Sequence, residues 1–424
     1  MRLSSTLQRG LVELPPPPGP IGMYVCGPTV YARAHIGNAR PYVVASWVAR
    51  WLRLRGYEVT LVHNITDVND KIYEAAPGAS AELAARATAW YLEDVGRFGL
   101  DEVDHFPKVT ESMDDIVAFI ADLVERGYAY EVEGDVYFRV AKQREYGRLS
   151  GQRPDQVEEQ EPNPRKEDPR DFALWKANKD GEDTWWDSPW GRGRPGWHIE
   201  CSAMAEKLLG PSFEIHGGGL DLVFPHHENE LAQSAARGHE FARVWMHNGM
   251  LRMTGDKMSK SLGNIASIQE VLDEWGRETA LVYFLTGHWR SPIDFSDERM
   301  AEAAARADGF REVFRNASQP APADAWSRFE AALDDDFNTP EALALMHEWR
   351  DHELLRRALD VFGLASVADV AEAPAELHEL ARLRQEARTA RDWAEADRLR
   401  DELAAAGWEV RDDPDGYRLV PRGS

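Results

Sequence analysis

The sequence predicts an α/β fold: a doubly wound parallel sheet with a connective insertion, followed by an α-helical bundle and a small C-terminal unit. Three observations support this. The first seventy residues alternate between strand-like and helix-like patterns, and an apolar strand pattern resumes only at 213–224. After about residue 300 the sequence is mostly Ala, Leu, Glu and Arg at helical spacing. A strand–helix–strand start indicates the right-handed parallel unit from which such sheets are built.

The first unit begins with a short buried strand in "GMYVCG" (22–27), which ends at a glycine. A helix is expected over 38–57, with apolar residues at helical spacing and Pro41 near its start. The segment "EVTLVHNIT" (58–66) then supplies a second strand. Ligands bind at the carboxyl ends of such strands, so the residues that follow each strand are the first candidates for a site.

The middle of the chain interrupts this sheet. Helical patterns give way to a strand-like "GDVYFRV" (134–140) and then to a polar stretch at 152–170, which has little to bury and is expected to be an exposed loop. We therefore interpret 81–195 as an insertion between two halves of the sheet. The later helical region breaks at "NASQPAPAD" (316–324) and ends in a small unit.

Composition restricts the class of protein. The 424 residues, 43% of them hydrophobic, suffice for two or three folded domains. The sequence shows no secretory leader and no apolar run of about 20 residues, so we expect a cytoplasmic protein without membrane contact. A net charge of −24 argues against non-specific coating of nucleic acid. The Arg-rich stretch 382–400 is more simply a solvated helix of mixed charge than a basic face.

The motif "FPHHENE" and the two cysteines suggest a metal site. His226 and Glu230 are four residues apart, so on a helix they share one face, although such a pair is more often a surface ion pair. Cys26 and Cys201 both fall at the expected ligand edge of the sheet, and with them the four residues form a tetrahedral zinc set. Each cysteine can also be a buried apolar thiol, and spacing alone does not choose between His226 and His227.

Two segments have the character of phosphate sites. In "AHIGN", His35, Gly37 and Asn38 lie where a helix start offers free amides to an anion. In "GDKMSKSLGN", Lys257 and Lys260 lie in a cationic, glycine-flanked loop suited to neutralising a polyphosphate. Alone, the first pattern is weak, and the second is also typical of an exposed basic turn.

A third segment, "HGGGLDLVFPHH", is expected at the end of a strand, where a glycine-rich backbone can pass close to a nucleotide; a tight turn is the alternative. Trp197 can wall a small pocket near the metal candidates, although a core tryptophan is as common. The candidate nucleotide-binding residues of this segment are Gly217, Gly218, Gly219 and Asp221.

The motifs "YVCGPTVY", "HIGN", "PGWHIECSAM", "GGGLDLVFPHHENE", "KMSKSLGN" and "LDDDFNTPEAL" occur in this order, and the chain closely resembles the cysteinyl-tRNA synthetases, a family of class I aminoacyl-tRNA synthetases. The resemblance runs from about residue 22 to 418. It implies a Rossmann catalytic domain over 1–300, with halves at about 20–80 and 195–245, the insertion at 81–195 and a KMSKS stem-contact segment at 246–300. It further implies an anticodon-binding-type bundle at 301–368 and a small unit at 369–418. The last six residues, 419–424, match a thrombin-type cleavage site of the kind added for expression.

The resemblance also implies site roles. The zinc ligands are expected to be Cys26, Cys201, His226 and Glu230, with His226 preferred to His227 because of the family. His35, Gly37, Asn38 and Lys260 are expected to contact ATP, in the HIGH and KMSKS motifs. Thr29 and Trp197 are expected near the amino acid. The implied partners are ATP with Mg²⁺, L-cysteine and tRNA(Cys), and we expect a monomer.

The implied reaction has two steps, attack of the cysteine carboxylate on ATP to give an adenylate and transfer of the cysteinyl group to tRNA. We expect catalysis by positioning and charge stabilisation from His35, Asn38, Lys257, Lys260 and Mg²⁺. Zinc would select the substrate as its thiolate, and serine would be a much poorer ligand, so no editing domain is needed.

Two alternative functions remain open, and the sequence departs from the family pattern in three places. A cysteine–amino-sugar ligase of the mycothiol type shares the catalytic half, and a non-catalytic zinc- and tRNA-binding protein is a reading of a different class. The chain has Ala32 and Asn69 where the family usually has aspartate. The helical region between "EALALMHEW" and "ELHELARL" also looks shorter than is common in the family.

Overall fold

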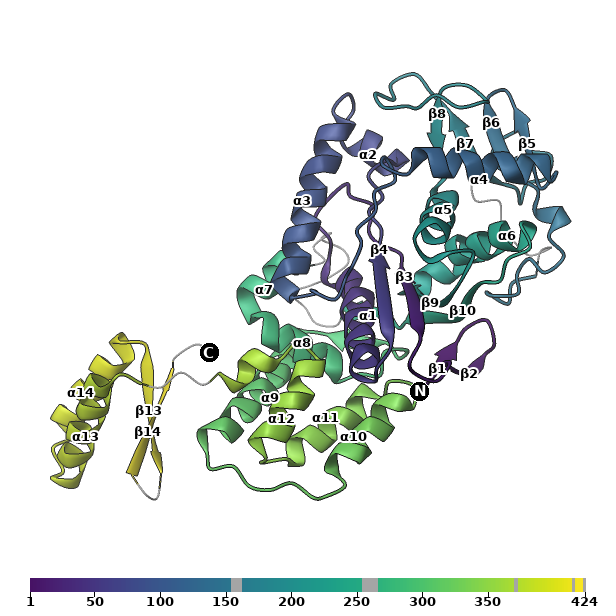
Figure 1. Cartoon of the computed structure of the whole chain (residues 1–424). Coiled ribbons are helices and arrows are strands. Elements are labelled where there is room, and N and C mark those ends of the chain that lie inside the picture. Colours follow the sequence, from purple (N-terminus) through teal and green to yellow (C-terminus); the bar gives the residue numbers. More distant parts are fainter. Residues whose placement is uncertain (154–161, 254–265, 370–372, 414–415, 422–424) are drawn as a thin grey trace.

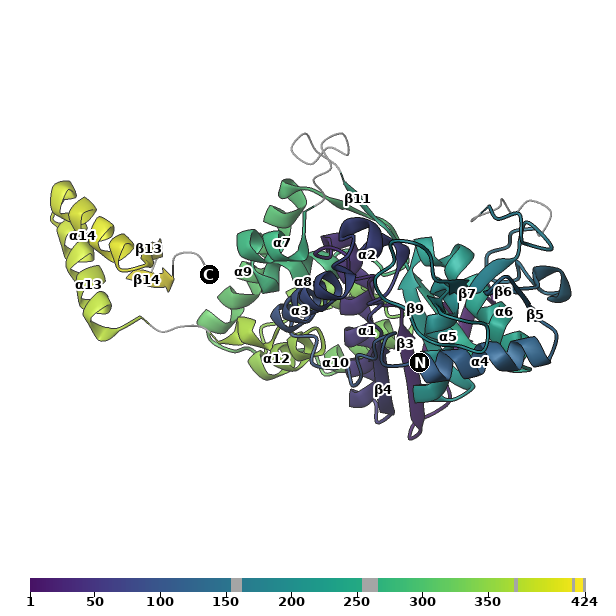
Figure 2. The ribbon, with the colours of Figure 1, turned by 90° about the horizontal axis from the view of Figure 1, so that it is seen from above.

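The structure is a computed structural model of the chain, and it describes residues 1–153, 162–253, 266–369, 373–413 and 416–421. Its centre is a four-stranded parallel sheet in the order β10-β9-β3-β4. The α/β class expected from the sequence is confirmed. Helix α1 lies on one side of the sheet and helices α5 and α6 lie on the other (Figure 2). The strands are β3 (Pro20–Val25), β4 (Glu58–His63), β9 (Ser212–Gly219) and β10 (Phe241–Asn248).

The first strand–helix–strand unit matches the sequence prediction closely. Helix α1 (Ile36–Leu54) connects β3 to β4, and it starts two residues earlier than expected, so that Pro41 lies inside it. Its buried side includes Trp47 and Trp51, both at most 1% exposed. Most of the unit therefore belongs to one large apolar core, which also includes side chains of the helices between residues 297 and 361.

The insertion between β4 and β9 contains more strand than the sequence indicated. Only the strand-like segment at 134–140 was expected, but four antiparallel strands pair in the order β5-β6-β7-β8 (Figure 1). Strands β5 and β8 are four and three residues long, which is too short for a periodic signal. The insertion and the helix after it comprise α2 (Asp70–Ala75), α3 (Ser80–Phe98), α4 (Met113–Glu125), β5 (Ala129–Val132), β6 (Asp135–Phe138), β7 (Phe172–Ala177), β8 (Gly193–Pro195) and α5 (Trp197–Leu209).

A helical region follows the sheet, and its break coincides with the predicted one at 316–324. A short parallel pair, β11 and β12, precedes the helical bundle. Helices α8 and α9 pack together, so the bundle continues directly from the segment before it. The elements are α6 (Glu228–Ala236), β11 (Leu251–Met253), α7 (Ile268–Trp275), α8 (Arg277–Leu285), β12 (Ile293–Phe295), α9 (Asp297–Arg315), α10 (Ala325–Asp334), α11 (Thr339–Glu348) and α12 (His352–Val361).

The C-terminal unit projects from the rest of the molecule (Figures 1 and 2). It consists of α13 (Ala375–Thr389), α14 (Trp393–Ala405) and the hairpin of β13 (Trp408–Asp413) and β14 (Gly416–Pro421), around a small core of Ala381, Leu403 and Val410. The stretch 382–400, expected as one solvated helix, is two helices, because Arg391 adopts a positive φ of 61° between them. Strand β14 includes residues 419–421 of the expected tail, which pair with β13.

The N-terminal hairpin of β1 (Arg2–Ser5) and β2 (Gly10–Glu13) joins the sheet to the bundle. The backbone amide and hydroxyl of Ser4 both donate to the carboxylate of Asp336, at 2.7 and 2.8 Å. The backbone amide of Trp245 in β10 donates to the hydroxyl of Ser5. Among the described residues, no helix is long and apolar enough to cross a membrane.

Candidate active site

The two cysteines lie together at the carboxyl edge of the sheet. Cys26 directly follows β3, and Cys201 lies in α5, whose amino-terminal half packs against the same strands. Both are buried and free, and their sulfur atoms are 3.7 Å apart. Two sulfurs bound to one tetrahedral zinc ion at about 2.3 Å each would be separated by about 3.8 Å. The spacing therefore suits a shared metal ion.

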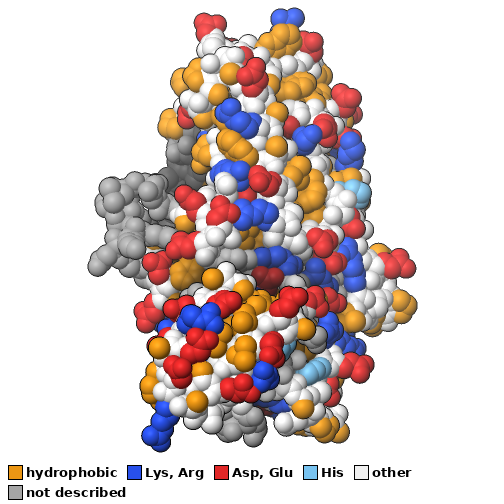
Figure 3. Space-filling model, turned by 90° about the vertical axis from the view of Figure 1, so that its left-hand side faces the viewer, with side chains coloured by type: hydrophobic (Ala, Val, Ile, Leu, Met, Phe, Trp, Pro, Cys, Tyr) orange, Lys and Arg blue, Asp and Glu red, His pale blue; other side chains and the backbone are white. Residues whose placement is uncertain are grey.

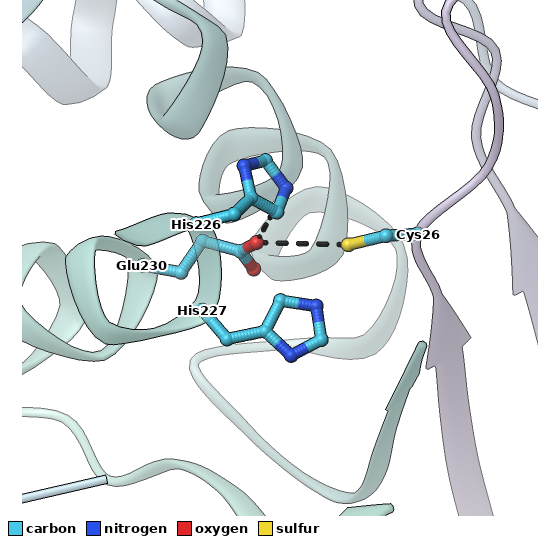
Figure 4. Close-up of side chains that lie close together, drawn as sticks. All are labelled: Cys26, His226, His227 and Glu230. Carbon is cyan, nitrogen blue, oxygen red and sulfur yellow. Dashed lines mark hydrogen bonds and ion pairs between the residues drawn. The ribbon is translucent and has the colours of Figure 1, made fainter. Parts of the chain in front are cut away.

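His226 and Glu230 complete the cluster from the opposite side (Figure 4). His226 lies in a π-helical turn at Val223–His227, and Glu230 lies one turn further on, in α6. Nε2 of His226 is 2.8 Å from Oε1 of Glu230, and the thiol of Cys26 donates to the same oxygen at 3.6 Å. All three side chains are at most 5% exposed. The structure thus brings together the four residues that the sequence singled out.

Burial and mutual charge give the cluster unusual pKa values. Burial raises the pKa of Cys26 well above its usual range. Burial also opposes ionisation of Cys201, but the hydrogen bond from the Cys26 thiol and the charge of His226 outweigh it and lower its pKa to about 6. Despite burial, the histidines beside Glu230 lower the pKa of that carboxyl to about 2. A thiolate and a carboxylate confined in a buried site form a donor set typical of zinc.

His227 is a geometric alternative for the fourth ligand. One ligand atom from each of Cys26, His226, His227 and Glu230 can be chosen so that all lie within 4.8 Å of one another. Nδ1 of His227 is 2.8 Å from Nε2 of His247, while its own Nε2 has no hydrogen-bond partner among the described residues. Geometry alone therefore leaves two sets that differ in Cys201 or His227.

Sequence reasoning missed two buried neighbours of the cluster. Nε2 of His216 in β9 is 2.9 Å from Oε2 of Glu230 and 3.9 Å from the sulfur of Cys26. The side-chain oxygen of Asn64, which follows β4, accepts from the thiol of Cys201 at 3.6 Å and from the amide of Gly27 at 2.9 Å. The only sequence signal for both was their position at strand ends, which does not reveal which neighbours they contact.

Trp197 forms a wall beside the cluster. It is the first residue of α5, is 37% exposed, and stacks on the imidazole of His226 with ring centroids 4.3 Å apart. A cavity of about 220 Å³ opens next to it, between the insertion sheet and the π-helical turn. Its lining includes Phe172, Trp197, His198 and Phe224. A cavity with several aromatic wall residues therefore adjoins the imidazole of His226, and the role of Trp197 beside the amino acid stays a prediction.

The "HIGN" segment forms the start of α1. His35 is the residue immediately before the helix, and its amide donates to the side-chain oxygen of Asn38 at 3.3 Å. Burial lowers the pKa of His35, with Asp221 opposing the shift, so its imidazole is neutral near pH 7. Its Nδ1 is buried and has no hydrogen-bond partner among the described residues. Gly37 lies beside this imidazole, because a Cβ there would be 2.9 Å from Nδ1.

The glycine-rich segment ends β9 at the same edge. A Cβ at Gly218 would lie 2.9 Å from Leu222 and 3.0 Å from His227, so the chain itself requires a glycine there. Gly217 accepts a hydrogen bond from the amide of Cys26 and Gly219 ends the strand, while Asp221 lies on an exposed short helix. Thr29 is half-buried in the loop after β3, in a parallel bridge with Thr66.

Lys257 and Lys260 lie outside the described residues, but the chain on the far side of their segment contacts α1. The amide of Ile36 donates to the carbonyl of Ala266, and the amide of Ile268 donates to that of Ala34, both at 3.0 Å. The "HIGN" segment is therefore joined by backbone hydrogen bonds to the described residues that begin at Ala266.

Three models of known protein families match parts of this chain. The model of the class I (C) tRNA synthetase catalytic domain matches residues 15–305. A cysteinyl-tRNA ligase anticodon binding domain matches 371–418, and a DALR domain matches 328–352. The chain belongs to the cysteinyl-tRNA synthetase family. It is therefore a class I aminoacyl-tRNA synthetase, an enzyme that aminoacylates tRNA with cysteine.

Individual relatives agree with this family. A cysteine–tRNA ligase of Halorhodospira halophila is 45% identical over 95% of both chains. One of Alkalilimnicola ehrlichii is 46% identical over 94% of this chain and 95% of its own. The fold of a Mycobacterium tuberculosis methionyl-tRNA synthetase matches with a TM-score of 0.58 over 82% of this chain and 89% of that one, at 15% identity. That likeness shows the class I fold in a distant synthetase.

Proposed function

We propose that this synthetase forms a cysteinyl-adenylate and selects its amino acid with a zinc ion held by Cys26, Cys201, His226 and Glu230. The observation that carries the proposal is the buried cluster of two sulfurs, an imidazole and a carboxylate, at the edge where α1 begins. We prefer Cys201 to His227, because the sulfur spacing and the low pKa of Cys201 suit a zinc thiolate and Nδ1 of His227 already faces His247.

Zinc bound at this cluster supplies a Lewis acid for the thiolate of the substrate, which a serine hydroxyl cannot match. The chain's own residues provide the surroundings. Trp197 and His198 wall the cavity and keep water from the buried sulfurs, while Asn64 and His216 orient Cys201 and Glu230 through the contacts described above. Discrimination against serine is therefore expected from ligand chemistry, without an editing site.

Adenylate formation needs no protein nucleophile, because the cysteine carboxylate attacks the α-phosphorus of ATP in line and pyrophosphate leaves. We assign charge stabilisation to His35 and Asn38 at the start of α1, to Lys257 and Lys260, and to Mg²⁺ carried by ATP. Nδ1 of the neutral His35 imidazole, which has no hydrogen-bond partner in the described part of the chain, is proposed to face a phosphate oxygen. Gly217, Gly218, Gly219 and Asp221 are proposed to face the nucleotide, and Thr29 the amino acid. We further propose that the enzyme acts as a cytoplasmic monomer.

The deciding experiment follows ATP-dependent transfer of labelled cysteine, to unfractionated bacterial tRNA in one reaction and to an amino-sugar acceptor in another. Labelled serine is the control. We expect label on tRNA from cysteine only. Label on the sugar alone would contradict the proposal and identify a small-molecule ligase, and charging with serine would contradict selection by zinc.

The zinc assignment has a separate test in Cys201→Ser. This variant is expected to lose bound zinc and cysteine-dependent exchange of pyrophosphate into ATP, because a serine hydroxyl is a poor zinc ligand. Metal content and exchange are measured on the same folded sample. Survival of both zinc binding and cysteine activation would show that Cys201 is not a ligand.

A further inference from the structure

An exposed group of aromatic and cationic side chains lies beside the candidate active site. Tyr31 follows β3 by six residues and is 42% exposed, and the ammonium group of Lys71 in α2 is 5.6 Å from its ring centroid. Trp90 in α3 carries two guanidinium groups over its indole, Arg33 at 5.3 Å and Arg86 at 5.4 Å. We call Tyr31, Lys71, Arg86 and Trp90 the aromatic rim.

The rim lies at the same sheet edge as the catalytic groups. Tyr31 belongs to the loop that ends at His35, and Lys71 is the second residue of α2, which follows β4. The bridge between Thr29 and Thr66 joins these two loops. Figure 1 shows α2 beyond the ends of β3 and β4, between α3 and the four-stranded insertion sheet. Tyr31 and Lys71 therefore lie at the carboxyl edge of the sheet, the edge at which His35 precedes α1.

The two cations of the rim have no carboxylate partner in the part of the chain that the structure describes. Arg33 pairs with Glu93 and Asp94, at 3.0 and 3.1 Å, but Lys71 and Arg86 form no ion pair with any described residue. The chain as a whole is strongly acidic, with a net charge of −24, and most of its described arginines do have carboxylate partners. Unpaired cations beside an accessible ring are the arrangement by which proteins hold single-stranded nucleic acid: bases stack on the ring and phosphates face the cations.

We propose that the aromatic rim binds the single-stranded 3′ end of tRNA, with one base stacked on Tyr31 and the backbone phosphates held by Lys71 and Arg86. The inference rests on the proposed function, because the 3′ end must reach the adenylate. According to this proposal, the rim is needed for transfer of the cysteinyl group to tRNA but not for formation of the adenylate. Trp90 is a positioning residue, because its indole holds the guanidinium of Arg86.

The two steps can be measured separately with the full chain. Exchange of pyrophosphate into ATP with cysteine, without tRNA, reports the first step, and kcat/KM for tRNA(Cys) transcript reports the second. The variants are Tyr31→Ala, Lys71→Ala and Arg86→Glu. Tyr31→Phe keeps the ring, and Arg328→Glu removes an exposed cation of α10 that also forms no ion pair with a described residue.

We expect Tyr31→Ala to lower kcat/KM for tRNA about tenfold, and Lys71→Ala and Arg86→Glu to lower it about fivefold and reduce its salt dependence. Exchange should stay within twofold of wild type in every variant, and Tyr31→Phe and Arg328→Glu should behave as wild type. Unchanged kcat/KM in Tyr31→Ala, or an equal loss in both assays, would overturn the inference. Absence of cysteine-dependent exchange in the wild type would instead reject the proposed function.

Discussion

His226 and His227 are neighbours in the sequence, yet their imidazoles have different partners. Nε2 of His226 lies 2.8 Å from Glu230, whereas Nδ1 of His227 lies 2.8 Å from Nε2 of His247. Both side chains are buried, and their imidazoles lie on either side of Glu230 with ring centroids 5.6 Å apart (Figure 4). The proposed zinc site therefore depends on which of two adjacent histidines, His226 or His227, binds the metal.

Alanine variants of the two histidines test this difference. His226→Ala is expected to lower zinc affinity at least about 100-fold because it removes a ligand, while His227→Ala, which alters only a neighbour of the site, should lower it by about tenfold or less. Competition with a chromophoric chelator measures both values without reference to activity. The reverse order would assign the ligand to His227.

At the scale of the element, helix α1 is held in place by a buried arginine. Its residue Arg40 is fully buried, and its guanidinium donates to the carbonyls of Gly249, Ser291 and His288 at 2.6, 2.7 and 2.9 Å. Burial lowers its pKa to about 10, and no carboxylate pairs with it among the described residues. The helix that presents His35 is thereby attached to the turn before β11 and to the loop before β12.

Arg40→Met should destabilise the fold by about 3 kcal/mol, because one buried and two partly buried hydrogen bonds to carbonyls are lost. Arg55→Met is the control at the opposite end of the same helix: its ion pairs with Glu330 and Asp334 are partly exposed and should contribute about 1 kcal/mol or less. Denaturant unfolding measures both changes. Equal losses in the two variants would show that the three carbonyls find other partners.

At the scale of the whole molecule, the C-terminal unit is only loosely joined to the body. It has its own small core, and an ion pair between Arg418 and Glu312 of α9 links the two parts. Figure 3 shows positive and negative side chains interspersed over the face that includes this unit, with no continuous basic surface. In α13 and α14, Arg382 and Arg398 pair with glutamates of their own helices.

Removal of the unit after residue 369 should separate the two activities. The remaining chain keeps the sheet, the cysteine cluster and the large core, so cysteine-dependent pyrophosphate exchange should stay within about threefold of wild type. Charging of tRNA(Cys) should fall at least about 100-fold, because the region that matches an anticodon-binding domain is lost. Charging at the wild-type rate would mean that the body alone recognises the tRNA.

The sequence by itself determined the local elements around the site. The unit of β3, α1 and β4 was predictable, because a buried strand, an amphipathic helix and a second strand each leave a periodic pattern in the sequence. Glycine or histidine residues near their ends mark where these elements begin and end. Cys26 and Cys201 could also be singled out, because they are the only two cysteines in a chain of 424 residues. The family resemblance added the choice of His226.

Only the tertiary structure decided which residues meet across the sheet. The contact of His216 with Glu230, the pairing of the short strand β8 with β7, and the cation–ring pair of Lys71 and Tyr31 join residues 14 to 40 positions apart. None of these leaves a local signal, because a strand of three or four residues has no measurable period and a contact depends on the order of strands in the sheet. Periodicity specifies an element and its buried face, whereas packing specifies its partner.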